Sequence, residues 1–218
     1  MPVPATSLPE RVGQWLRQAR ALTGWDATRV LRQVRTARGR TRWELVRTLR
    51  ELPLRGGHVS ALVALLDEGD ALLRWEVEEV LSHLPPHRVA PACLLRLEQG
   101  EPEEGLASCI RVLAALKADN ALDTIVRYQG HPSVHVRVAV ADALAQFVEH
   151  VQAQNALIQL LQDPEPAVRR AAVWTLRRSN VPWAGPVLEV QARERPEPWC
   201  ASRSAVSPGR EGGGSHGA

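Results

Sequence analysis

Tryptophan and arginine recur at positions that could form a recognition surface. Two early segments have nearly the same sequence, Arg42-Trp43-Glu44-Leu45 and Arg74-Trp75-Glu76-Val77, and Trp174 lies among arginines further along the chain. Both side chains bury a large area while keeping a polar group, and both are enriched among the residues that dominate protein interfaces. These residue types therefore favour binding over bond-breaking chemistry.

Histidine offers a metal-binding alternative. Two pairs lie four residues apart, the spacing at which one helix can hold zinc: His83 with His87, and His131 with His135. Prolines interrupt the first pair, and Pro132 places His131 at or before a helix start. The three cysteines, Cys93, Cys109 and Cys200, have no metal spacing. We therefore predict no metal site, no catalytic residue and no cofactor.

The elements that position these residues come from an internal repeat. Val136-Arg137 and Leu144 recur as Val168-Arg169 and Leu176, so the numbering shifts by 32 in each case. Steps of 31 or 32 in the numbering back from Leu144 reach Leu113, Leu81 and Leu49, and the residues seven before the five leucines are Arg42, Arg74, Leu106, Arg137 and Arg169. A fixed offset of this size is typical of repeat arrays, in which each unit stacks on the next.

Each leucine lies in an apolar pattern of helical period, and a second apolar segment precedes it, so each repeat holds two helices. This arrangement predicts an all-α fold, an α-solenoid or superhelix of about five helical hairpins. The expected pairs are 26–36 with 41–51, 57–67 with 71–83, 87–98 with 103–117, 119–129 with 133–149, and 151–162 with 165–179. A single helix at 183–193 closes the series.

On these residues the chain resembles HEAT repeats, specifically the short bacterial repeats of the phycobilisome-lyase HEAT-like type. The resemblance covers roughly residues 26–193. It implies that an acidic residue in the turn within each repeat and the arginine seven before the leucine form a ladder between neighbouring repeats. Asp163 with Arg169 and Glu68 with Arg74 keep the six-residue spacing, whereas His131 with Arg137 and Thr36 with Arg42 depart from it. The resemblance also implies that the second helices line a concave surface.

Composition divides the chain into three parts. Residues 1–25 are expected to form an N-terminal arm and a cap helix at 8–22, residues 26–195 the repeat solenoid, and residues 196–218, rich in Pro, Gly, Ser and Arg, a disordered tail. No run approaches the roughly 18 apolar residues of a membrane span. The N-terminus does not look like a signal peptide, so we expect a cytoplasmic protein without a membrane partner.

The net charge of +3 is unevenly distributed. Residues 1–55 hold twelve basic and four acidic residues, which gives +8, whereas residues 56–130 hold six and twelve, which gives −6. The basic N-terminal end could bind nucleic acid through phosphate contacts.

Winding each second helix at about 100° per residue separates a core stripe from an outward face. The outward positions give nine candidate partner-binding residues: Trp43, Arg47, Arg50, Trp75, Glu79, Arg111, Arg170, Trp174 and Arg177. An alternative for two of them is that Trp43 and Trp75 stack on each other between adjacent repeats.

Together these patterns predict a non-catalytic scaffold or adaptor that binds a protein partner on its concave surface. Two alternatives stay open. One is nucleic-acid binding through the basic N-terminal repeats, with a DNA-glycosylase-like activity as its enzymatic form. The other, implied by the resemblance, is a subunit of a bilin lyase. The sequence leaves the oligomeric state open.

Overall fold

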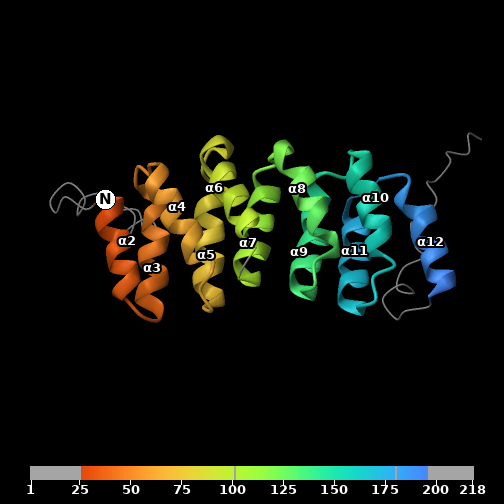
Figure 1. Cartoon of the computed structure of the whole chain (residues 1–218), viewed down its shortest axis with the longest axis horizontal. Helices are drawn as coiled ribbons and strands as arrows, with labels where there is room; N and C mark the ends of the chain where they lie inside the picture. Colours follow the sequence, from red (N-terminus) through yellow and green to blue (C-terminus); the bar gives the residue numbers. More distant parts are fainter. Residues whose placement is uncertain (1–25, 101, 180, 196–218) are drawn as a thin grey trace, which may run out of the picture.

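The computed structural model describes residues 26–100, 102–179 and 181–195. This part of the chain is a row of helices and short 3-10 turns without strands (Figure 1). The helices are α2 (Ala27–Thr36), α3 (Arg40–Thr48), α4 (Gly56–Leu65), α5 (Ala71–Ser82), α6 (Pro86–Gln99), α7 (Glu103–Ala115), α8 (Leu122–Arg127), α9 (Val134–Ala143), α10 (Val151–Leu160), α11 (Pro166–Ser179) and α12 (Ala184–Glu194). The predicted all-α solenoid is confirmed.

The helices pair into five hairpins, α2–α3, α4–α5, α6–α7, α8–α9 and α10–α11, followed by α12. We call the two members of a hairpin its first and second helix. Each second helix packs on the second helix of the next hairpin, so α3, α5, α7, α9 and α11 form one continuous layer. The predicted cap helix at 8–22 and the tail at 196–218 lie outside the described residues.

The five repeated leucines lie at the centre of this arrangement. Leu49, Leu81, Leu113 and Leu144 are fully buried and Leu176 is 1% exposed. They belong to one apolar cluster that runs through every hairpin. Because each hairpin adds its leucine to the same cluster, the repeat period of the sequence is also the period of the core.

Some helix boundaries differ from the prediction. Asp26 caps α2, with Oδ1 accepting the Arg29 amide at 2.7 Å. The segment 119–129, however, contains only a short α-helix between two 3-10 turns, and α9 gives way to a 3-10 turn at Leu144–Gln146. The fourth hairpin is therefore shorter than its apolar pattern indicates.

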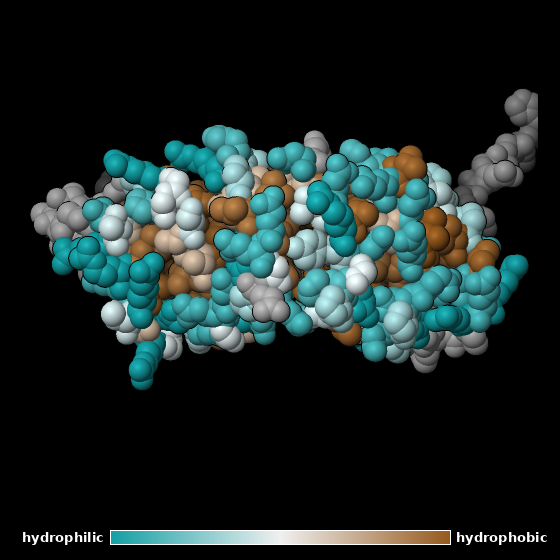
Figure 2. Space-filling view, in the orientation of Figure 1, coloured by the Kyte–Doolittle hydropathy of each residue, from teal (hydrophilic) through white to brown (hydrophobic). Residues whose placement is uncertain are grey.

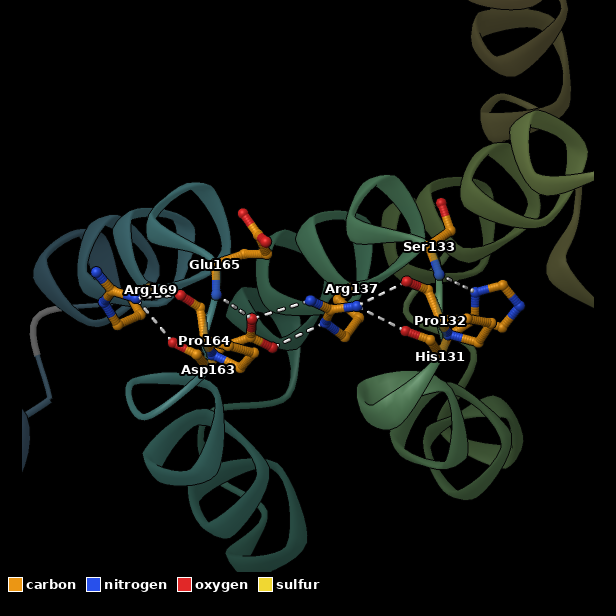
Figure 3. A network of polar contacts seen from close by, with 8 residues as sticks. All are labelled: His131, Pro132, Ser133, Arg137, Asp163, Pro164, Glu165 and Arg169. Atoms are coloured by element: carbon orange, nitrogen blue, oxygen red, sulfur yellow. Dashed lines mark hydrogen bonds and ion pairs between the residues drawn. The ribbon is translucent and has the colours of Figure 1, made fainter.

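The repeated arginines connect neighbouring hairpins, as in the ladder that the resemblance implies. Arg137 donates to Oδ2 and Oδ1 of Asp163 at 2.8 and 3.0 Å, and also to the carbonyls of His131 and Pro132 in its own turn (Figure 3). Arg169 donates to the carbonyl of Asp163, not to its carboxylate, at 2.9 Å. The carboxylate thus pairs with the repeated arginine of the preceding hairpin, not with that of its own.

The same pairing occurs at the other end of the solenoid. Arg42 forms an ion pair of 2.5 Å with Glu68 of the next hairpin, and Arg74 donates to the Glu68 carbonyl. In the middle, the positions that would carry the acid are Gly100 and His131, which have no carboxylate. Two other ion pairs join the second and third hairpins there: Arg96 with Asp67 at 2.9 Å, and Arg111 with Glu78 at 2.7 Å.

The Arg137–Asp163 pair is almost enclosed, since the two side chains are 10% and 7% exposed. Burial alone would raise the pKa of Asp163. Hydrogen bonds from Arg137 and the Glu165 amide, with the charges of Arg137 and Arg169, outweigh burial and hold this pKa below its ordinary value. The charged pair is therefore the stable state in the folded protein at neutral pH.

Removing the buried carboxylate of Asp163 should lower the free energy of unfolding more than removing the more exposed carboxylate of Glu68. Asp163→Ala leaves the Arg137 guanidinium buried without its partner, and we expect a loss of about 3 kcal/mol in the free energy of unfolding. Glu68→Ala, whose side chain is 36% exposed, should lose at most about 1 kcal/mol. Urea unfolding at pH 7 measures both, and equal losses would contradict this account of the ladder.

The pKa of Asp163 also predicts a pH dependence. Because the folded-state pKa is below the unfolded value of about 3.9, the stabilisation is complete above pH 5 and decreases as the pH falls through the folded-state pKa. Unfolding of the wild type and of Asp163→Ala across pH 2–7 should converge at the acid end. A constant difference between the two curves would show that the charge of Asp163 is irrelevant.

Gly105 in α7 leaves room for the Asp67–Arg96 pair. A Cβ atom at this position would overlap Oδ1 of Asp67, whereas a Cβ on Gly185 of α12 would meet nothing within 4 Å. Asp67 cannot move aside freely, because Arg96 Nε holds its two oxygens at 2.9 and 3.1 Å. Glycine here is a packing requirement of the joint between the second and third hairpins.

Replacing these two glycines by alanine should have different effects on the stability of the protein. Gly105→Ala displaces Asp67 from Arg96 and is expected to lower the free energy of unfolding by about 1–3 kcal/mol. Gly185→Ala only restricts the unfolded chain, so it should leave stability unchanged or raise it by up to about 1 kcal/mol. Thermal unfolding of both variants tests this, and a stabilised Gly105→Ala would refute the packing requirement.

Candidate partner-binding surface

The structure places all nine predicted site residues on the layer of second helices. We call their outward side the second-helix face. The residues are Trp43 and Arg47 on α3, Arg50 in the 3-10 turn after it, Trp75 and Glu79 on α5, Arg111 on α7, and Arg170, Trp174 and Arg177 on α11. They share one layer, but their surroundings divide them into two groups.

The charged residues of α3, α5 and α7 are engaged with one another. Arg47 pairs with the buried carboxylate of Glu76, and the hydrogen bond and charge of Glu76 raise the pKa of Arg47. Arg50 pairs with Glu79 at 2.6 Å, and Arg111 pairs with Glu78. These four candidates therefore form ion pairs between adjacent hairpins. Helical periodicity does not reveal this role, because the partners lie about one repeat away in the sequence.

Trp43 is half-buried and also connects two hairpins. Its Nε1 donates to Oδ2 of Asp70 at 3.0 Å. Asp70 caps α5 by accepting the amides of Leu72 and Leu73. The hydrogen bond from Trp43 and those two amides outweigh the effect of burial and hold the pKa of Asp70 below its ordinary value. The alternative that Trp43 stacks on Trp75 is wrong, because the ring contacts among the described residues are Tyr128–His131 and Phe147–His150.

Trp75 occupies the same repeat position as Trp43 but projects into solvent. Its side chain is 55% exposed, beside Leu72 at 52%. The residue 27 positions after Trp43 is Asp70, an acceptor, whereas the residue 27 positions after Trp75 is Pro102, which has no polar side chain. Without a polar group to bind its indole nitrogen, Trp75 stays on the surface.

The α11 residues form the second group. Trp174 is 56% exposed, with Arg170 four residues before it and Arg178 four residues after it on the same side of the helix. Arg178 is not among the nine predicted site residues, although its place on this side of the helix follows from the helical period. Next to it, an open depression is lined by Ala145, Gln146, Arg178 and Ser179.

Asp142 on α9 lies near this group. Surrounding protein atoms remove part of the hydration of its carboxylate and raise its pKa, while the charges of Arg178 and Arg111 act in the opposite direction. The carboxylate is thus within electrostatic reach of both arginines. The second-helix face is mixed in charge at α9 and becomes basic at α11.

The first helices and α12 expose apolar side chains as well. Leu95, Val151, Ile158 and Val190 are 42–68% exposed, and Figure 2 shows an apolar area over α10 and α12 between hydrophilic side chains. All four are aliphatic. They lack the polar group that Trp75 and Trp174 carry, so they form a natural comparison set for the second-helix face.

Within the described ranges, no cluster of three or more His, Cys, Asp or Glu side chains is arranged to hold a metal ion. Cys93 and Cys109 are buried in the core with free thiols. Among the helices of the same ranges, none has the length and apolar character needed to cross a membrane.

Comparison with known proteins agrees with this architecture. The HEAT repeat family model matches residues 154–178, which lie in α10 and α11. No curated protein matches the sequence. The structure of the complex of CpcE and CpcF of phycocyanin lyase from Nostoc sp. PCC7120 has a chain similar to this one, with a TM-score of 0.60 and 21% identity over 67% of this chain and 95% of that one.

Two further solved structures are more distant. An engineered protein has a TM-score of 0.44 and 19% identity over 76% of this chain and 88% of its own. A designed armadillo repeat protein in complex with the peptide (KR)4 has a TM-score of 0.45 and 19% identity, over 90% of this chain and 91% of its own. The repeat match shows a HEAT repeat at α10 and α11, and the stacked hairpins form a HEAT-like solenoid whose fold is similar to that of the phycocyanin lyase chain.

Proposed function

We propose that this solenoid is a non-catalytic scaffold that binds a protein partner on its second-helix face. The observation that carries the proposal is the exposure of Trp75 and Trp174, each more than half exposed on a second helix. A rigid, exposed indole gains much from burial in a partner and loses little conformational freedom when it binds. Both rings are held by helices of the repeat layer, so the surface is formed in advance.

The ion pairs of α3, α5 and α7 support this surface. Arg47, Arg50 and Arg111 are each tied to a glutamate of the neighbouring hairpin. The glutamates largely balance the charges of these arginines. The ion pairs therefore hold the helices in position and leave groups of both charges near Trp75. A partner that touches both exposed tryptophans must extend over α5, α7, α9 and α11, and the repeat layer offers such an extended surface.

The test compares two matched double variants in affinity capture from the native lysate, with and without nuclease. Trp75→Ala/Trp174→Ala should reduce the captured partner at least tenfold, the scale expected for two interface anchors. Leu95→Ala/Val151→Ala removes similarly exposed apolar side chains from the first helices and should leave capture unchanged. Far-UV circular dichroism checks that both variants stay helical. Loss of capture in the first-helix variant alone would place the interface on the opposite layer and refute the proposal.

A second candidate function, nucleic-acid binding, is favoured by the arginines of α2. Arg29, Arg32 and Arg35 are exposed, none has an acidic partner among the described residues, and residues 27–43 contain no acid. Such a surface suits phosphate contacts without sequence specificity. A lyase-type subunit, the other alternative, would instead give a bilin-dependent absorbance change on mixing.

Reversing these charges tests the second candidate. If α2 binds nucleic acid, Arg29→Glu/Arg32→Glu/Arg35→Glu should abolish binding to a labelled DNA duplex, and the wild-type affinity should fall steeply with salt. The control Arg127→Glu/Arg193→Glu/Arg195→Glu changes the net charge equally at other exposed positions. Fluorescence anisotropy at low and at physiological salt measures both, and equal binding by the two variants would eliminate α2 as the site.

A further inference from the structure

A stripe of three side chains on α11 differs from the rest of the second-helix face. Arg170, Trp174 and Arg178 are spaced four residues apart, so they follow one side of the helix, and all three are exposed. Helix α11 contains no acidic residue. Arg170 and Arg178 take part in none of the ion pairs among the described residues, whereas Arg47, Arg50 and Arg111 each pair with a glutamate. We call these three side chains the α11 stripe.

The positive charge of the α11 stripe does not extend onto the neighbouring helices α10 and α9. Helix α10, the other helix of its hairpin, has no charged residue, and its exposed polar side chains are amides. On the neighbouring second helix, α9, Asp142 carries negative charge within reach of Arg178. A nucleic-acid backbone needs a track of cations along its phosphates, and Asp142 would repel one that crossed from α11 to α9. The surroundings therefore suit a short acidic ligand that lies along a single helix.

The spacing of the stripe corresponds to that of an extended peptide. Four residues of an α-helix rise about 6 Å, and two residues of an extended strand rise about 6.6 Å. Residues i, i+2 and i+4 of a strand point to the same side. An extended segment with acids at i and i+4 and an apolar residue at i+2 would thus place its three side chains over Arg170, Trp174 and Arg178.

We propose that the α11 stripe binds an extended acidic segment of a protein, in which two carboxylates flank an apolar residue at alternate positions. This inference rests on the proposed function and names the kind of partner that this end of the surface accepts. The guanidinium groups of Arg170 and Arg178 would each receive a carboxylate through paired hydrogen bonds, and Trp174 would cover the apolar side chain. Since the stripe is exposed, binding of a short segment is weak and decreases with salt.

Short peptides labelled with an uncharged dye test this directly on the full chain. The probe is Gly-Glu-Ser-Leu-Ser-Glu-Gly, and the control Gly-Glu-Glu-Leu-Ser-Ser-Gly has the same composition without the alternation. Anisotropy at low salt should show at least fivefold tighter binding of the probe. Arg170→Glu/Arg178→Glu should abolish that binding and create binding to Gly-Lys-Ser-Leu-Ser-Lys-Gly. Arg127→Glu/Arg193→Glu, with the same change in net charge on α8 and α12, should bind the acidic probe as the wild type does.

The outcomes separate this inference from the proposed function. Equal binding of probe and control peptide, or retained probe binding by Arg170→Glu/Arg178→Glu, overturns the acidic segment. A single-stranded DNA that displaces the probe from the stripe and binds more tightly would also overturn it and assign the stripe to nucleic acid. In affinity capture, a partner that is lost with Trp75→Ala/Trp174→Ala but kept by Arg170→Glu/Arg178→Glu leaves the scaffold function standing and rejects only the acidic segment.

Discussion

A single helical hairpin of this chain cannot enclose its own apolar side, and the rest of the structure depends on that constraint. The leucines at 49, 81, 113, 144 and 176 become buried because each hairpin lies against the next. Stability therefore comes from interfaces between units that are adjacent in sequence. Contacts between side chains about one repeat apart recur along the whole solenoid, from Arg42–Glu68 to the bond from the Thr175 hydroxyl to the Ala141 carbonyl.

The repeated arginine serves these interfaces in two ways. Its guanidinium binds carbonyls of its own turn and, where the next turn offers a carboxylate, that carboxylate as well, so one side chain fixes both the turn and the neighbour (Figure 3). Buried ion pairs often add little net stability over apolar packing, but an unpaired charge there is costly. The Arg137–Asp163 pair therefore mainly disfavours other ways of packing the two hairpins, because these would leave a buried charge without its partner. Where the acid is absent, at Gly100, Asp67–Arg96 and Glu78–Arg111 hold the second and third hairpins together instead.

The sequence was sufficient to predict the features that depend on local pattern. The apolar period located the hairpins, and Asp26 was recognisable as a cap from its position before the first apolar residue. Which surface side chains find a bonding partner could not be predicted in the same way. Trp43 and Trp75 have nearly identical neighbours in sequence, yet one is bonded and the other exposed, because their environments depend on residues 27 positions later, Asp70 and Pro102. Predicting such partners needs the geometry between hairpins, which neither helix propensity nor hydrophobic period contains.

Whether an arginine already forms an ion pair decides where the scaffold can bind a partner. A ligand that approached Arg47 would have to compete with the buried carboxylate of Glu76, and the exchange of one ion pair for another yields little net free energy. At α11 no such pair must be broken at Arg170 or Arg178, so a new carboxylate contact adds to the burial of Trp174. The same chemistry thus has different consequences along one layer: Arg47, Arg50 and Arg111 hold the repeats together, whereas Arg170 and Arg178 can receive a new partner. Binding strength on this face should therefore depend on the exposed tryptophans and on α11, although arginine is present at both ends.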